Sequence, residues 1–189
     1  NPVRLTDAGE SFDSKPAVLP DNRTIIFERR QFKGGKSILM KVSLDGGEAV
    51  PLFTENATLE MFPRVSPDGK HFAYTMMNYN RDNMRFIRLL RLMALDGGAV
   101  TKLVKEFDVN IGWNYKFAPD GKNLTYVNTQ GGQNLFNFPI DGSQPKPLTN
   151  FNSGIILNFA WSRDGKRLYI VRGIVNNELV MLKDAPRQS

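Results

Sequence analysis

Few side chains in this sequence could carry out catalysis. His71 is the only histidine, and there is no cysteine. A serine hydrolase would need His71 as its general base, yet no Gly-x-Ser-x-Gly turn is present to hold a nucleophile. Sites built from several histidines or from thiolates cannot be assembled from this composition. We therefore predict that the chain is not an enzyme and that it holds neither a metal ion nor a cofactor.

The carboxylates are numerous, but the recurring ones have a structural explanation. There are 19 Asp and Glu residues, enough in number for the paired carboxylates of a glycosidase. In the stretch from Ser66 to Gly69, however, proline fixes φ for a type I turn, and the glycine after Asp68 accepts a positive φ. We assign to turns the aspartates found in this and similar contexts: Asp45, Asp68, Asp96, Asp120, Asp141 and Asp164.

The turn sequences recur at long, nearly regular intervals. Pro-Asp-Gly, or a variant of it, centres on Asp21, Asp68, Asp120 and Asp164, which are 47, 52 and 44 residues apart. The variants are Asn22 in place of glycine, which tolerates positive φ, and Arg163 in place of proline. A second turn, of Asp-Gly type or a diverged form of it, follows in each unit, at Asp45, Asp96, Asp141 and Asp184. Four repeats of one structural unit are therefore present.

Short apolar runs between the turns indicate strands, four to a unit, joined by hairpins. The run Arg85–Leu95 also has helical periodicity, but its place in the repeat predicts a strand. Antiparallel units of four strands and this length are the blades of a β-propeller. We predict an all-β propeller with blades over about 7–53, 54–104, 105–149 and 150–189.

The four units leave open how the ring closes. Residues 1–6 resemble the unit tail Gln144–Thr149, which predicts an outer strand. This strand either belongs to a preceding blade of a larger ring of six to eight blades, or pairs with the fourth unit's strand at 178–183 and closes a ring of four blades. Both arrangements avoid an unpaired sheet edge, and we favour the larger ring. A third arrangement has two chains sharing an eight-bladed ring, which would make the protein a homo-oligomer.

The charge and hydropathy patterns restrict the partners. The net charge is +6, but the basic residues are scattered along the chain, which is typical of a solvated basic face. No apolar run approaches the roughly 18 residues of a membrane span. We therefore expect neither a nucleic-acid partner nor insertion into a membrane.

Candidate binding residues lie in two places. Loops that differ between units carry aromatic and cationic side chains suited to a protein interface: Phe32, Tyr79, Arg81 and Trp113. On the innermost strands, Arg64 and Lys116 share one repeat position beside the predicted central channel. They adjoin a position predicted to be core, at Val18, Val65, Phe117 and Trp161. The two cations either pair with acids of a neighbouring blade or receive an acidic peptide terminus or carboxylate.

The repeat also resembles that of a known family. Ser-Pro-Asp-Gly-Lys, then an apolar strand, a strand ending in Asp-Gly-Gly and a tail ending in Leu-Thr, is similar to the WD-like repeat of TolB-type β-propellers. The resemblance is carried by Asp68 to Lys70, Asp120 to Lys122 and Asp164 to Lys166. It implies a non-catalytic protein- or ligand-binding scaffold of the bacterial periplasm, in a Tol-Pal type system, with a peptidoglycan-associated lipoprotein as partner. The alternative is the sensory or accessory propeller of a larger regulator, kinase or peptidase, which would be cytoplasmic in a regulator.

Overall fold

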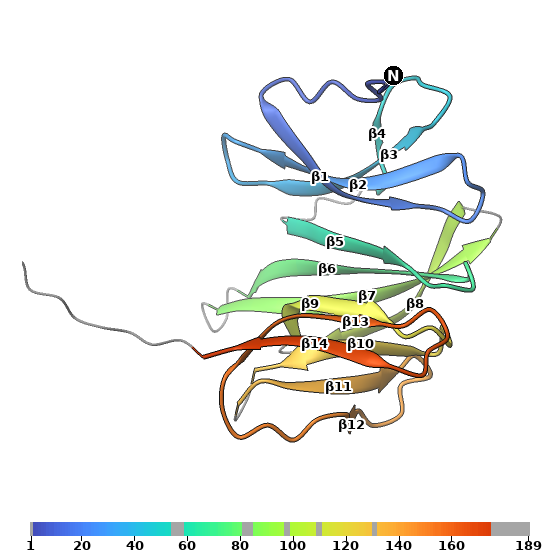
Figure 1. Cartoon of the computed structure of the whole chain (residues 1–189). Coiled ribbons are helices and arrows are strands. Elements are labelled where there is room, and N and C mark those ends of the chain that lie inside the picture. Colours follow the sequence, from blue (N-terminus) through green and yellow to red (C-terminus); the bar gives the residue numbers. More distant parts are fainter. Residues whose placement is uncertain are drawn as a thin grey trace, which may run out of the picture.

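The computed structural model describes residues 2–53, 59–80, 85–96, 99–108, 111–129 and 132–174. All its regular elements are β-strands, and Arg85–Asp96 forms one of them, as the repeat predicted. Figure 1 shows the first three blades following one another from top to bottom, with the fourth turned in front of the third. Among these described residues, no helix has the length and apolar character that a membrane crossing requires.

The first two blades each contain four strands. In the first they are β1 (Ser11–Val18), β2 (Thr24–Gln31), β3 (Ser37–Ser43) and β4 (Val50–Pro51); in the second, β5 (Leu59–Val65), β6 (His71–Asn80), β7 (Arg85–Asp96) and β8 (Ala99–Asp108). Consecutive strands of a blade pair antiparallel. One parallel pair, Ser37 with Leu59, also joins β3 to β5, so that the two blades are continuous in hydrogen bonding.

The third blade again has four strands, and two strands of the fourth are described. They are β9 (Ile111–Phe117), β10 (Asn123–Asn128), β11 (Asn134–Pro139) and β12 (Lys146–Pro147), followed by β13 (Ile155–Trp161) and β14 (Leu168–Gly173). The strand predicted at 178–183 lies outside the described residues. At the other end of the chain, Pro2–Thr6 is not in a strand. Leu5 and Thr6 instead line a cavity with Phe27 and Val42 of the first blade.

The Pro-Asp-Gly turns have the same hydrogen bonds in all four blades. The amide of Gly69 donates to the carbonyl oxygen of Ser66 at 2.9 Å, and the amide of Lys70 donates to Oδ1 of Asp68 at 3.1 Å. The equivalent bonds occur in the other three turns. Asn22 takes the glycine position with a φ of 52°, which confirms that it replaces glycine there. These four aspartates thus stabilise turns.

Three apolar cores hold consecutive blades together. Because strand side chains alternate between faces, β6 presents Phe72 and Tyr74 to the first blade and Ala73 to the third. The third core joins residues such as Leu135 to Phe159 of the fourth blade. Each large side chain buried in this way contributes about 1.5–3 kcal/mol. The array depends on these contacts, because a single blade has two faces to cover.

The prediction of a core role was wrong for Val18, which is 50% exposed. Its counterparts behave as predicted, since Val65 and Phe117 pack in the cores between their own blade and the preceding one. Val18 belongs to the first blade, and no blade in the described structure precedes it. The four blades therefore form an open arc, as expected of part of a larger ring.

Candidate ligand-binding site on the inner strands

Arg64 and Lys116 lie on the innermost strands of the second and third blades. Arg64 follows an irregularity in the pairing of β5 with β6, where Phe62 adopts a φ of 58° before a proline. Such a bulge bends a strand and re-aims the side chains beside it. Lys116 is near the end of β9, opposite Thr125. Both cations are therefore close to the end of the blades that carries the Pro-Asp-Gly turns.

The Lys116 ammonium group reaches across to the fourth blade. Its Nζ donates to the carbonyl oxygen of Phe159 and to Oδ1 of Asn158, the latter at 3.2 Å. It also lies 5.2 Å from the centre of the Phe159 ring. Burial lowers the pKa of Lys116, and the nearby Arg64 guanidinium lowers it further. The charge of Lys116 is thus partly desolvated and repelled by a second cation.

Arg64 has only a neutral acceptor in the described hydrogen bonds. Its Nη1 donates to the carbonyl oxygen of Pro63 at 2.9 Å. The ion pairs found among the described residues involve other cations. One of them is Lys15, whose Nζ lies 3.0 Å from a carboxylate oxygen of the buried Glu28. In the described part of the chain, no ion pair joins Arg64 or Lys116 to an acid of a neighbouring blade.

A cavity of about 370 Å³ opens beside Lys116. Its wall has two cations, Lys116 and Arg163, and no acid. The other lining residues are the turn prolines Pro67 and Pro119, together with Phe117, Ala160, Trp161 and Ser162. The volume is in the range of small-ligand sites and suits one or two amino-acid side chains. A cavity with this wall would favour an anion.

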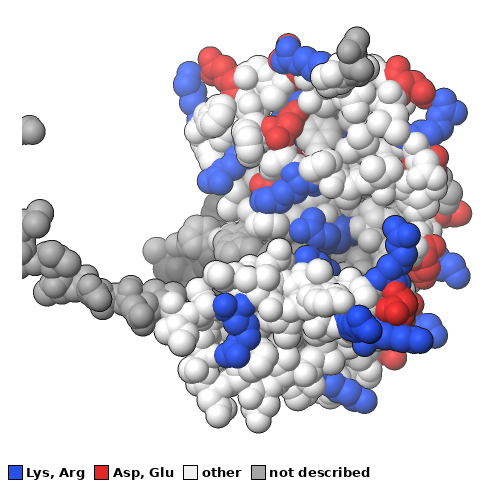
Figure 2. Space-filling model, viewed as in Figure 1, with Lys and Arg blue, Asp and Glu red and all other residues white. Residues whose placement is uncertain are grey.

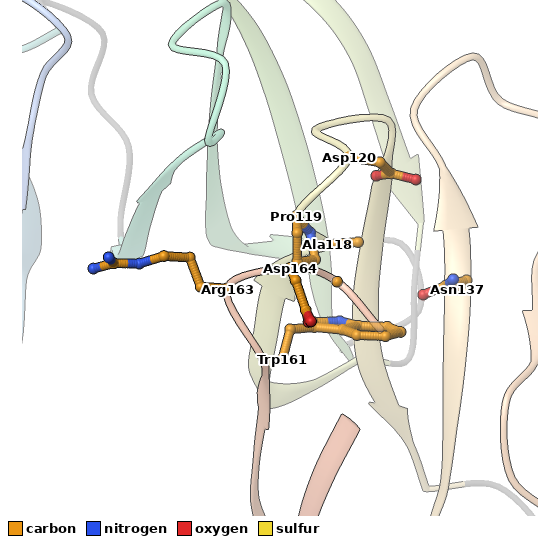
Figure 3. A pocket seen from close by; sticks show the side chains of 8 residues that line it. Ala118, Pro119, Asp120, Asn137, Trp161, Arg163 and Asp164 are labelled. Carbon is orange, nitrogen blue, oxygen red and sulfur yellow. The ribbon is translucent and has the colours of Figure 1, made fainter. Parts of the chain in front are cut away.

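A second cavity, of about 360 Å³, shares Pro119, Trp161 and Arg163 with the first but has acids in its wall. Figure 3 shows Trp161 lying flat beneath Asp164, with Arg163 extending away from Asp120 and Asn137. The indole Nε1 donates to Oγ1 of Thr125 at 2.9 Å. Asp120 and Asp164 accept turn amides, and among the described residues no group of acids or histidines could hold a metal ion.

Sequence reasoning missed Arg163 as a site residue. The sequence does contain a signal for this role, because Arg163 occupies the position at which the turns of the other three blades have proline. Arg163 is a cation at a turn position that otherwise holds proline. It could therefore have been grouped with Arg64 and Lys116 from the sequence. Figure 2 shows basic groups scattered over the face in view, several of them near the middle, where the surface is hollowed.

Among the loop candidates, Phe32 lies away from this site. Phe32 is 74% exposed in the loop between β2 and β3. This loop is at the opposite end of the blade from the Pro-Asp-Gly turn, about 25 Å away along a strand of this length. Arg81 and the side chains of Tyr79 and Trp113 lie outside what the structure describes. Their role in binding stays a prediction.

Comparisons with known proteins agree with this architecture. No family model matches the chain. A TolB homolog of Chlorobium luteolum is 24% identical over 170 residues, which are 89% of this chain and 35% of that protein. The structure of a putative TolB from Agrobacterium tumefaciens has a TM-score of 0.60 at 18% identity, over 86% of this chain and 55% of that one. Puromycin hydrolase has a TM-score of 0.66 at 19% identity, over 86% of this chain and 28% of that one.

The fold and the repeat define a β-propeller built from four-stranded blades, and the described residues supply three of these blades and two strands of a fourth. The fold is TolB-like, since the chain is similar to a TolB homolog in sequence and to a putative TolB in structure. The chain spans about a third of the curated relative that it matches and just over half of the putative TolB structure.

Proposed function

We propose that the chain is a non-catalytic binding propeller that receives an acidic protein segment at the cavity beside Lys116. In this proposal it is a TolB-like component of a periplasmic Tol-Pal type system, and the acidic segment belongs to a peptidoglycan-associated lipoprotein. The single observation that carries the proposal is the wall of the cavity, which contains Lys116 and Arg163 and no carboxylate.

The electrostatics of the site favour an anionic ligand. Burial and the Arg64 charge both lower the pKa of Lys116, so the free protein pays a cost for keeping this group protonated. A carboxylate in the cavity would offset the repulsion and the lost hydration. Charge-assisted hydrogen bonds from ammonium and guanidinium groups to a carboxylate are among the stronger polar contacts. Pro67, Phe117 and Trp161 would cover the apolar part of the ligand.

The test is binding of the soluble domain of a peptidoglycan-associated lipoprotein, measured by calorimetry. We expect Lys116→Ala and Arg163→Ala each to weaken binding by tenfold or more, about 1.4 kcal/mol, as for residues central to an interface. Lys41→Ala is the matched control, because Lys41 is an exposed lysine on β3 of the first blade. Equal affinities for the three variants and the unchanged protein would reject the cavity as the binding site. No binding by the unchanged protein would reject the lipoprotein as partner.

A second candidate function follows from the similarity to puromycin hydrolase, of which the chain covers 28%. In this case the propeller is an accessory domain of a larger peptidase or regulator. The coding sequence upstream of Asn1 distinguishes the two: a signal peptide supports the periplasmic scaffold, and a winged-helix or kinase domain supports a regulator. Peptidase sequence beside the propeller would support the accessory domain.

A further inference from the structure

The second cavity, of about 360 Å³, offers a ligand quite different groups from the cavity beside Lys116. Its wall contains the carboxylates of Asp120 and Asp164, the amide of Asn137 and the indole of Trp161. All the residues that line it belong to the described part of the chain. Its volume is in the range of small-ligand sites. The proposed function makes no use of the amide or of the two carboxylates.

A chain of hydrogen bonds fixes the orientation of the indole and of the amide. The Trp161 Nε1–H group donates to Oγ1 of Thr125 at 2.9 Å, and this hydroxyl donates to Oδ1 of Asn137 at 2.7 Å. An indole N–H can only donate, so the single hydrogen of the fully buried Thr125 hydroxyl must go to Asn137. The Asn137 atom that receives it must therefore be the oxygen. The NH₂ group of Asn137, which takes part in none of the described hydrogen bonds, is left as a donor at the wall of the cavity.

The two aspartates keep the capacity to accept further hydrogen bonds. In Asp164, Oδ1 accepts a hydroxyl and an amide of its own turn, at 2.6 and 3.0 Å, and none of the described hydrogen bonds uses Oδ2. In Asp120, Oδ1 accepts turn amides and Oδ2 accepts the side-chain amide of Asn123 at 2.8 Å. An ionised carboxylate has about four acceptor sites. Both aspartates can therefore stabilise their turns and bind a ligand at the same time.

These groups match the chemistry of a sugar ring. A pyranose has C–H groups on its faces and hydroxyls around its edge, and each hydroxyl both donates and accepts. Figure 3 shows the flat indole of Trp161 at one side of the cavity, with Asp164, Asp120 and Asn137 placed around it. The indole can cover the C–H face, while the carboxylates accept from the hydroxyls and the Asn137 amide donates to one of them.

The same groups disfavour charged ligands. Two carboxylates in the wall repel a phosphate or another anion. A cation without an acceptor would leave the NH₂ group of Asn137 unpaired once it is covered, which costs free energy. A neutral ligand that carries both donors and acceptors satisfies every group in the wall.

We propose that this cavity binds a neutral pyranose sugar, stacked on Trp161 and hydrogen-bonded to Asn137, Asp120 and Asp164. The site binds and breaks no bond. It goes beyond the proposed function, because neither Lys116 nor an acidic protein segment takes part in it. The buried hydroxyl of Thr125 holds the indole and the amide in place before the sugar arrives, which lowers the entropy cost of binding.

The experiment is a titration of the protein with methyl glycosides of glucose, galactose, mannose and N-acetylglucosamine, followed by tryptophan fluorescence. Trp161 is one of two tryptophans, and we expect at least one of these glycosides to give a saturable change. Asn137→Asp keeps the acceptor for Thr125 but replaces the donor with a third carboxylate. Asp164→Asn keeps Oδ1 for the turn but removes the charge. Each should weaken sugar binding about tenfold or more, as expected for hydrogen bonds that involve a charged group.

Asp68→Asn is the matched control. Asp68 accepts the hydroxyl of Ser66 and the amide of Lys70 just as Asp164 accepts its own turn's hydroxyl and amide, but it does not line the cavity. Urea unfolding should therefore show similar losses of stability for the two variants, and only Asp164→Asn should lose sugar affinity.

Three results would overturn the proposal. The first is the absence of saturable binding for all of these glycosides. The second is an affinity that Asn137→Asp and Asp164→Asn leave unchanged, because the sugar would then bind elsewhere. The third is saturable binding of methylguanidinium in place of the sugars, which would show a cation site. The titrations contain no acidic protein, so their failure is distinguishable from failure of the proposed function.

Discussion

Replacing Gly69 with alanine tests how the turns of successive blades fit together. Gly69 has a φ of 69°, and a Cβ placed on it would lie 2.7 Å from Cγ and 2.9 Å from Cβ of Pro20. Pro20 belongs to the turn of the preceding blade, and its ring has little freedom to move away. Gly69→Ala therefore imposes both a strained backbone and a steric clash between two blades.

Gly35 separates the two effects. Its φ of 63° is close to that of Gly69, but a Cβ there has nothing within 4 Å. A left-handed conformation costs an alanine about 1–2 kcal/mol, and alanine regains about 0.4–1 kcal/mol by restricting the unfolded chain. We expect Gly35→Ala to cost about 1 kcal/mol. Gly69→Ala should cost a further 1–3 kcal/mol or so, the usual range for overpacking a close contact.

The assay is urea unfolding at equilibrium, with the midpoint and slope compared between variants. A double-mutant cycle with Pro20→Gly identifies the clash, because removing the proline ring should recover most of the additional cost of Gly69→Ala. Two results would refute the reasoning. One is a difference of less than about 0.5 kcal/mol between Gly69→Ala and Gly35→Ala. The other is a cycle in which the effects of Pro20→Gly and Gly69→Ala simply add.

Two further predictions concern polar contacts. Arg29 donates two hydrogen bonds to the Asp13 carboxylate, at 2.7 and 2.8 Å, and they lower the pKa of Asp13. The pair therefore stabilises the folded protein above the ordinary carboxyl pKa of about 4. This stabilisation is lost as the pH falls through the lower pKa of the folded state. Urea unfolding between about pH 5 and pH 2 should show a steeper loss of stability for the unchanged protein than for Asp13→Asn, and equal slopes would count against the pair. Trp161→Phe removes the hydrogen bond to Thr125 and should lower the free energy of unfolding in urea by about 1 kcal/mol. A variant as stable as the original would show that this bond does not help to hold the third and fourth blades together.

The turns and strands could be predicted from the sequence because both depend on local chemistry. Asp68 accepts the amide two residues later, and Asn22 tolerates a left-handed backbone, whatever surrounds them. The strand-forming run of β10 is likewise local, and its four central residues are all buried because both faces of the blade are covered. Even Arg85–Asp96, with its competing helical periodicity, follows the repeat, since a helix there would leave both neighbouring strands unpaired.

The environment of a residue within the array could not be predicted in the same way. Val18 and Val65 have the same side chain at the same repeat position, but Val18 has no preceding blade and is half exposed. Glu28 gave no sign of being buried, because its partners, Lys15 and the amide of Phe62, come from two different blades. The cavity beside Lys116 likewise requires the turn of the fourth blade to lie against the inner strand of the third.

The candidate site lies where the repeat is broken, for a physical reason. Positions between two blades are restricted to side chains that fill the space there. As a result, the interiors of the blades are similar. Arg163 replaces a turn proline, and Lys116 occupies a position at which the first and fourth blades have alanine. Together the two residues place two positive charges around one cavity. Lys116 also bonds to Asn158 and Phe159 of the fourth blade, and in the proposed function an anion bound between Lys116 and Arg163 would offset the cost of bringing the two charges together.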